Sequence, residues 1–190
     1  PGDPGGKLEM RVRGVNVFPG YRDAPQLTAK AFDAEGYYCI GDAGLLVDEA
    51  APERGVVFNG RVAEDFKLTT GTWVSVGTLR VRLVSALAPL AQDAVITGHD
   101  RDEVGALVFP SAAAAALAPD ELRQRIATAL AALKAEGGGS SQVPGRALLL
   151  AEPPSADAGE ITDKGYINQG AVLKRRAAQV AALYASGPDV

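Results

Sequence analysis

The chain has 190 residues, of which 47% are hydrophobic and 22% are charged, a composition typical of globular rather than disordered proteins. Its formal net charge of −4 argues against a partner as negatively charged as nucleic acid. Cys39 is the only cysteine and His99 the only histidine, which excludes an internal disulfide and a multi-cysteine zinc site and disfavours a histidine-based metal site or catalytic triad. We therefore expect no metal ligands in this chain and no nucleic acid partner.

The sequence also lacks the features of a membrane or exported protein. Its longest uninterrupted apolar run covers residues 112–118, far short of the roughly 20 residues that a membrane-spanning helix needs. No signal peptide is visible, so we expect no membrane contact and a cytoplasmic location. The start at Pro1, followed by GDPGG, indicates a fragment of a longer protein.

The first part of the chain is rich in short strand signals broken by turn residues. Apolar and charged residues alternate from 8 to 12, which is the period of a half-buried strand. Residues 24–32 carry the pattern of a short helix, and apolar runs at 44–47 and 55–58 indicate two further strands. The sequence therefore predicts a small β subdomain over residues 1–60.

From residue 61 onwards, helix and strand patterns alternate. The predicted helices cover residues 76–87, 120–134 and 170–185, and the predicted strands cover residues 93–97, 104–109 and 146–150, the first two of them as a hairpin. The apolar side of the last helix is expected to hold Leu173, Ala177, Val180 and Tyr184, and its other side Lys174, Arg175 and Arg176. Residues 61–190 are thus expected to form a compact α+β domain with a short sheet and about three helices.

The segment that joins the two parts, residues 59–77, combines two cations with a glycine turn. Arg61 is a permanent cation whose planar fork suits phosphate or ribose oxygens, and Lys67 follows six residues later on a flexible stem. Gly71 allows a tight turn or a close approach to a ligand. An exposed hairpin with ordinary surface charges is the alternative interpretation of the same residues.

Two further residues could contact a nucleotide or its reacting groups. Asp42 follows Gly41 at a predicted strand end, where a carboxylate can accept two hydrogen bonds from a ribose diol; an aspartate with a local turn role is the alternative. Lys164 lies beside Gly165 in a loop. It is either a solvated surface lysine or, placed over a reacting carboxylate and phosphate, a group that stabilises developing negative charge.

Three ordered motifs connect these residues. The first motif has Gly6, Leu8, Gly14, Gly20, Tyr21, Pro25, Thr28 and Phe32, followed by a YxxGD form at Tyr38, Gly41 and Asp42. The second is the joining segment with Arg61 and Lys67, and the third is GEITDKGYIN at residues 159–168. Together they resemble the adenylate-forming superfamily, which includes acyl-CoA and aryl-CoA synthetases, firefly luciferase and the adenylation domains of peptide synthetases.

The resemblance covers essentially the whole chain and departs from the family pattern in places. Lys7 replaces a glutamate of the first motif, and Gly71 lies four residues after Lys67 instead of the usual three, as in the KLxxGEYV form of long-chain acyl-CoA synthetases and carboxylic acid reductases. The surroundings of Lys164 differ from the common GKxxR ending. The segments EDFKLTTGTWVSVG and GEITDKGYINQ are most similar to those of bacterial feruloyl-CoA synthetases.

The resemblance implies a reaction in two steps. Such enzymes use ATP and Mg²⁺ to convert a carboxylate into an acyl-adenylate, then rotate the C-terminal domain and transfer the acyl group to the thiol of coenzyme A. The pivot of this rotation would be Ala63. By this resemblance, Lys164 would act in adenylation and Lys67 in thioester formation.

The resemblance also assigns binding roles. Asp42 would hold the ribose hydroxyls, and Arg61 would bind nearby ribose or phosphate oxygens. Gly71, Thr72 and Trp73 would line the route of the pantetheine arm of coenzyme A, although Trp73 as a core anchor is the favoured alternative.

The phosphate-binding loop rich in serine, threonine and glycine, and the acid pocket, belong in this family to a large N-terminal region. We therefore expect that missing adenylation region as a partner, a small aromatic carboxylic acid as substrate, and no activity of the isolated chain. The first alternative is a fatty-acyl ligase or the adenylation region of a carboxylic acid reductase, whose thiol belongs to a carrier protein. The second is an interaction module without catalysis.

Overall fold

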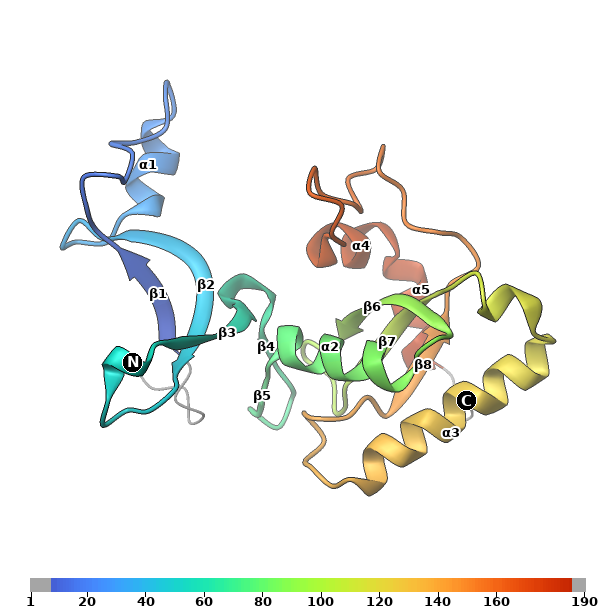
Figure 1. Cartoon of the computed structure of the whole chain (residues 1–190). Coiled ribbons are helices and arrows are strands. Elements are labelled where there is room, and N and C mark those ends of the chain that lie inside the picture. Colours follow the sequence, from blue (N-terminus) through green and yellow to red (C-terminus); the bar gives the residue numbers. More distant parts are fainter. Residues whose placement is uncertain (1–7, 186–190) are drawn as a thin grey trace. The chain divides into compact units, whose positions relative to one another are not determined.

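The first three strands of the chain form one antiparallel sheet in the order β1, β2, β3 (Figure 1). The computed structural model describes residues 8–185, so Gly6 and Lys7 of the first motif lie outside the described residues. The strands are β1 (Leu8–Val12), β2 (Tyr38–Leu46) and β3 (Val56–Arg61), with helix α1 (Pro25–Ala31) between β1 and β2 and a 3₁₀ turn at Pro52–Arg54 before β3. These elements confirm the predicted strands and helix, and β2 begins earlier than expected.

This sheet belongs to the first of two compact units, which ends at Ala63, while the second unit begins at Glu64. Among the described residues of the first unit, Ala43 is the only buried hydrophobic side chain. Helix α1 begins with a proline, whose fixed φ suits a helix start. The Thr28 hydroxyl accepts a hydrogen bond from the Tyr21 amide at 2.9 Å and so ties the helix to the preceding loop.

The second unit contains four helices and two small sheets within residues 64–185. Its elements are β4 (Phe66–Lys67), β5 (Trp73–Val74), α2 (Val76–Ala86), β6 (Ala91–Thr97), β7 (Gly105–Pro110), a 3₁₀ turn (Ala114–Ala116), α3 (Pro119–Ala135), β8 (Arg146–Leu149), α4 (Gln169–Arg175) and α5 (Ala177–Ala185). β4 and β5 form a short hairpin, and the larger sheet has the order β6, β7, β8. β6 and β7 are antiparallel as predicted, and β8 is parallel to β7.

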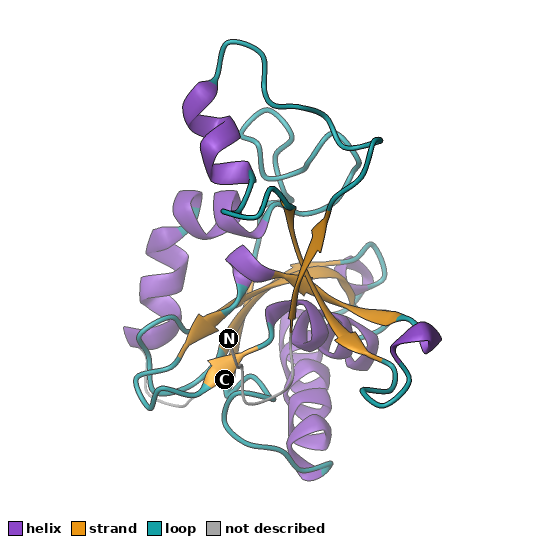
Figure 2. Ribbon diagram, turned by 90° about the vertical axis from the view of Figure 1, so that its left-hand side faces the viewer, coloured by secondary structure: helices purple, strands orange, loops and turns teal. Residues whose placement is uncertain are grey.

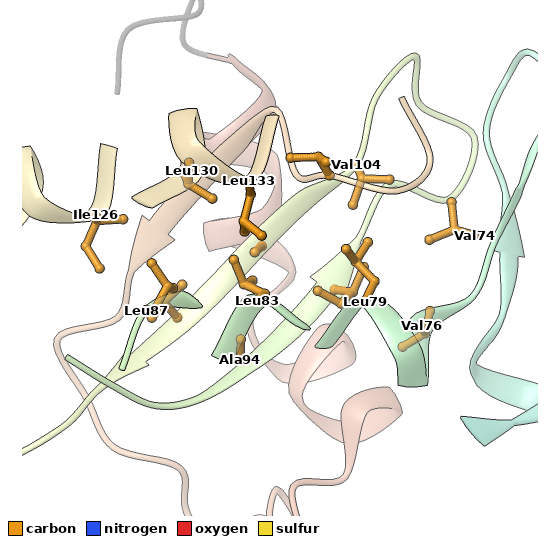
Figure 3. Packing of buried hydrophobic residues seen from close by; sticks show 14 of the residues in the cluster. Val74, Val76, Leu79, Leu83, Leu87, Ala94, Val104, Ile126, Leu130 and Leu133 are labelled. Carbon is orange, nitrogen blue, oxygen red and sulfur yellow. The ribbon is translucent and has the colours of Figure 1, made fainter. Parts of the chain in front are cut away.

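The larger sheet is covered by helices on both faces (Figure 2). Because side chains alternate along a strand, Ala94 and Ile96 of β6 pack with α2 and α3, whereas Val95 packs with α4 and α5. On the first face, Leu83 of α2 lies next to Leu133 of α3 (Figure 3). The core of this unit is therefore divided into two layers by its sheet, which gives the α+β fold expected from the sequence.

The last predicted helix is wrong in two respects. The chain forms α4 and α5 with a break at Arg176, whose φ of −101° and ψ of 31° are not helical. Arg176 is only 3% exposed and lies on the buried side with Val172 and Leu183, while Ala177 is exposed. Leu173, Val180 and Tyr184 pack against the core as predicted, whereas Ala177 is exposed and Arg176, predicted on the polar side, is buried. No helix within residues 8–185 is long and apolar enough to cross a membrane.

Candidate functional site

Asp42 and Arg61 lie opposite each other on β2 and β3 and form an ion pair. The Arg61 Nη1 donates to the Asp42 Oδ1 at 2.8 Å. The side chains are 59% exposed for Arg61 and 27% for Asp42, so both remain accessible to a ligand. The structure therefore brings together the two residues expected to bind a nucleotide, although the sequence predicted each of them separately.

A pair of glycines directs these two side chains. Gly41 precedes Asp42 with a φ of +76°, and Gly60 precedes Arg61 with a φ of +80°, a left-handed conformation that glycine adopts at low cost. The ladder between β2 and β3 changes register just after the Asp42–Arg61 pair, as in a β-bulge. Asp42 thus lies at an irregularity in the middle of β2, which corrects the expected strand end. A β-bulge of this kind changes the direction in which the neighbouring side chains point.

Ala63, the predicted pivot, lies in a 3₁₀ turn (Val62–Glu64) between β3 and β4. Its side chain is exposed, and the first compact unit ends at this residue. On the other side of the boundary, an Asp65 carboxylate oxygen accepts a hydrogen bond from the Val76 amide at 3.0 Å. This contact satisfies an amide at the start of α2 and fixes the segment after the boundary to the second unit.

Lys67 and Trp73 are partners in the β4–β5 hairpin. The Lys67 Nζ lies 5.0 Å from the centroid of the Trp73 ring, within range of a cation–π interaction. Trp73 is 44% exposed, so the favoured alternative of a core anchor is wrong. The neighbouring Phe66 and Val74 point inward instead, because side chains alternate across the two strands. The segment is therefore an exposed hairpin that presents a cation and an aromatic face.

The tip of this hairpin contains Gly71 and Thr72, which are both exposed. The Gly71 amide donates to the Leu68 carbonyl at 2.9 Å and closes the turn. The Thr69 amide donates to the Arg101 carbonyl at 2.9 Å, so the hairpin is fixed to the turn that joins β6 and β7. The residues expected along the pantetheine route thus lie together on one exposed hairpin that is hydrogen-bonded to the neighbouring turn.

Lys164 occupies the tip of a second tight turn, between Ile161 and Ile167, which form an antiparallel bridge. The Thr162 amide donates to the Tyr166 carbonyl at 2.8 Å, and the Gly165 amide donates to the Thr162 carbonyl at 2.9 Å. Lys164 is exposed, whereas Ile167 is buried. The turn therefore projects the amino group of Lys164 into solvent from an ordered base.

Directly before this turn, the fully buried Glu160 forms an ion pair with Arg176. The Glu160 carboxylate accepts from the Arg176 Nε at 2.8 Å and Nη2 at 2.9 Å, and from the Ser155 amide at 2.8 Å. The Arg176 guanidinium is the main reason that the pKa of Glu160 is lowered to about 2, against the opposing effect of burial. Sequence reasoning missed both residues. One signal was present, since Arg176 follows the apolar Val172 by four residues and shares its helical side.

The structure brings some of the predicted site residues together and separates others. Asp42 contacts Arg61 in the first unit, and Lys67 contacts Trp73 in the second. Within the second unit, the loop that carries Lys164 precedes α4, while the β4–β5 hairpin precedes α2 and lies in a different part of the unit (Figure 1). Residues 8–185 contain no group of three or more histidine, cysteine or acidic side chains that could hold a metal ion.

Sequence comparison finds relatives among carboxylic acid reductases and acid–CoA ligases. A carboxylic acid reductase from Segniliparus rugosus is 28% identical over 181 residues, which cover 93% of this chain and 15% of the reductase. A medium-chain fatty-acid–CoA ligase from Escherichia coli is 56% identical over 47 residues, covering 25% of this chain and 8% of the ligase. This chain therefore spans a small part of the length of these relatives.

A solved structure of a related protein has a similar fold over most of this chain. The adenylation domain of the Segniliparus rugosus carboxylic acid reductase, in complex with AMP and a co-purified carboxylic acid, is 26% identical to this chain with a TM-score of 0.80, covering 94% of this chain and 28% of that one. The profile of the AMP-binding enzyme C-terminal domain matches residues 67–187, more than half of the chain. The chain therefore belongs to the AMP-binding enzyme C-terminal domain family of the adenylate-forming superfamily.

Proposed function

We propose that this chain is the C-terminal part of an ATP-dependent, AMP-forming ligase that activates a carboxylic acid and transfers it to a thiol. In the first step, a carboxylate oxygen attacks the α-phosphorus of ATP and pyrophosphate leaves. In the second step, a thiolate attacks the acyl carbon and AMP leaves. The observation that carries this proposal is the exposed Asp42–Arg61 pair, in which each residue follows a glycine with positive φ shortly before the boundary between the units.

Asp42 and Arg61 are suited to hold the nucleoside part of ATP. The Asp42 carboxylate can accept hydrogen bonds from both hydroxyls of a ribose, while the Arg61 guanidinium can donate to ribose or phosphate oxygens. In the structure they hold each other at 2.8 Å, which keeps both side chains oriented. Because the pair is exposed, a nucleotide can replace one contact without leaving a buried charge unpaired.

Lys164 and Lys67 are suited to separate steps. An ammonium group beside the reacting carboxylate and α-phosphate would stabilise the negative charge that develops during adenylation, and we assign this role to Lys164. We assign Lys67 to thioester formation, with Gly71, Thr72 and Trp73 along the path of the thiol arm. A rotation around Ala63 would exchange the two loops, and the exposed 3₁₀ turn between the units supports this pivot.

The first unit supports the presence of an N-terminal adenylation region as partner. Val56, Val57 and Phe58 of β3 are between 51% and 62% exposed, an unusual state for consecutive large apolar side chains. An upstream region of the kind found in the relatives would cover such a strand and supply the phosphate-binding loop and the acid pocket. We accordingly propose that the isolated 190-residue chain does not form adenylates. Residues 8–185 offer no cluster of three or more metal-binding side chains, so we propose that the Mg²⁺ that accompanies ATP is held outside them.

Two acid and acceptor pairs are candidates. The segments around Lys67 and Lys164 resemble those of feruloyl-CoA synthetases, and this resemblance favours a hydroxycinnamic acid and coenzyme A. The match to a carboxylic acid reductase over 93% of this chain favours an acid of the kind that such a reductase activates, with transfer to a thiol on a carrier protein. Thioester formation with coenzyme A and with a carrier protein, measured on the same adenylate, separates the two. A cytoplasmic location is proposed for both.

The proposal is tested in the protein that joins an adenylation region to this chain. Lys164→Ala should reduce ATP–pyrophosphate exchange by about 100-fold, since charge stabilisation of this kind contributes two to three orders of magnitude, while transfer from supplied acyl-adenylate stays within about threefold. Lys67→Ala should show the reverse pattern. Equal loss in both steps for both variants would contradict the division of roles, and pyrophosphate exchange by the 190-residue chain alone would contradict its dependence on a partner region.

A further inference from the structure

We infer that Glu160 is a positioning residue, which holds the Lys164 turn in its working orientation through a buried ion pair with Arg176. The inference rests on the proposed role of Lys164 in adenylation and extends it to residues that the sequence motifs did not indicate. The proposed chain of contacts runs from the sheet to Arg176, from Arg176 to Glu160, and from Glu160 to the turn at residues 161–167.

The base of the turn is held at both ends by Glu160 itself. The Glu160 amide donates to the Ser155 carbonyl at 3.0 Å, and its carbonyl accepts from the Asn168 amide at 2.9 Å. Its carboxylate also accepts from the Ser155 amide at 2.8 Å. One residue therefore joins the loop before the turn to the residue after it. Asn168 in turn caps α4, because its side chain accepts from the Ala171 amide at 3.2 Å.

Arg176 fixes Glu160 to the body of the unit. Its guanidinium donates to the Glu152 carbonyl at 3.0 Å and to the Pro153 carbonyl at 2.8 Å, in addition to the two bonds to Glu160. The guanidinium carbon lies 5.0 Å from the ring centroid of Phe109 on β7. Each of the three guanidinium nitrogens thus donates at least one hydrogen bond. The break between α4 and α5 occurs at this residue.

The buried ion pair between Glu160 and Arg176 is better suited to orienting the two side chains than to stabilising the fold. A buried ion pair costs desolvation energy that an apolar pair of the same shape does not, so it adds little stability relative to such an apolar pair. Its planar, two-point geometry, however, allows only one arrangement of the two side chains. A catalytic group displaced by about 1 Å can lose about 100-fold in rate. Lys164 lies four residues from Glu160, so a fixed Glu160 restricts where its amino group can reach.

The test compares Glu160→Gln with a matched control elsewhere in the same unit. Glu160→Gln keeps the size and removes the charge. The control is Asp93→Asn, which weakens the partly buried two-point pair between Arg80 and Asp93 on α2 and β6. Both variants are made in the protein with its adenylation region, and both half-reactions are measured. Cleavage by trypsin after Lys164, quantified by mass spectrometry, reports the order of the turn independently of activity.

We expect Glu160→Gln to lower kcat for adenylation by about 10-fold to 100-fold with little change in the KM for ATP, and to leave transfer from supplied acyl-adenylate within about threefold. Cleavage after Lys164 should become about 10-fold faster, because local opening exposes the turn. Asp93→Asn should leave the ratio of the two half-reactions and the cleavage rate at Lys164 unchanged. If Glu160→Gln does not fold, Arg176→Lys, which keeps the charge and loses the two-point geometry, is expected to give the same pattern.

The outcomes separate this inference from the proposed function. If Lys164→Ala impairs adenylation and neither Glu160→Gln nor Arg176→Lys shifts the ratio of the half-reactions, the positioning role is wrong and the role of Lys164 stands. Equal losses in both half-reactions for the Glu160 variant would show a structural role only. If Lys164→Ala itself leaves adenylation intact, the proposed function fails, and the inference fails with it.

Discussion

Two arginine–carboxylate pairs of this chain, Arg61–Asp42 and Arg176–Glu160, share their chemistry and differ in their surroundings. In each pair, the shortest distance between guanidinium nitrogen and carboxylate oxygen is 2.8 Å. The first pair has side chains that are 59% and 27% exposed, and the second has side chains that are 4% and 0% exposed. Distance alone therefore does not reveal what an ion pair does.

The difference lies in what happens when one partner is lost or replaced. Water can solvate either partner of the exposed pair, so a ligand with hydroxyl or phosphate oxygens can take a place in it at low cost. The partners of the buried pair have no such substitute, because an unpaired charge would remain in a medium of low dielectric. We therefore expect the first pair to exchange its contact for a ligand and the second pair to keep its contacts.

The largest effect should follow from breaking the buried pair. Arg176→Ala leaves the Glu160 carboxylate buried without its main partner, and we expect the free energy of unfolding to fall by about 3–5 kcal/mol. Urea unfolding followed by the fluorescence of Trp73, the single tryptophan of the chain, measures the second unit.

The neighbouring Arg175 provides the control for this prediction. It also donates to Glu160, at 2.9 Å, but its own side chain is 44% exposed. Arg175→Ala should therefore lower the free energy of unfolding by no more than about 1 kcal/mol. Equal losses for the two arginine variants would mean that burial does not decide the strength of these pairs.

The second prediction concerns the stability of the fold at low pH. The pKa of Glu160 lies at about 2 in the folded chain, against an ordinary value of 4.5. A lowered folded pKa stabilises the fold above pH 4.5, and this stabilisation is lost as the pH falls from 4.5 to 2. The pH-dependent loss should reach about 3 kcal/mol. Arg175 and Arg176 face Glu160 and stay charged throughout this range.

Glu160→Gln isolates this contribution, since glutamine does not titrate. Its free energy of unfolding should depend much less on pH between 4.5 and 2 than that of the unaltered chain, as measured by urea unfolding at a series of pH values. A variant with the same pH dependence as the unaltered chain would show that another group carries the acid sensitivity.

Much of this fold follows from local patterns. The strand at 93–97 and the helix at 120–134 could be predicted because alternation and helical spacing are properties of neighbouring residues. Asp42 and Arg61 could each be singled out by their type and motif. Their mutual contact could not, because it depends on the register of two strands and on the irregularity between them.

Arg176 shows the other limit of sequence reasoning. Its neighbours Lys174 and Arg175 are exposed, and a basic run of this kind usually marks a solvated helix face. Its partner Glu160 lies 16 residues earlier, beyond the range of helical periodicity. The burial of Arg176 therefore could not be predicted from the sequence, because it depends on how the turn that carries Lys164 packs against α4 and α5.

The smallest effect on stability, and the sharpest contrast, should come from the exposed pair. Asp42→Asn should change the free energy of unfolding by less than about 1 kcal/mol, because water replaces the lost contact to Arg61. In the protein with its adenylation region, calorimetry should nevertheless show AMP bound about 10-fold more weakly, since hydrogen bonds to a charged acceptor contribute about 1.5–3 kcal/mol. A large loss of stability would place Asp42 with Glu160 as a structural residue, and unchanged AMP affinity would remove it from the nucleotide site. Either result would end the distinction between an exchangeable pair and a fixed one.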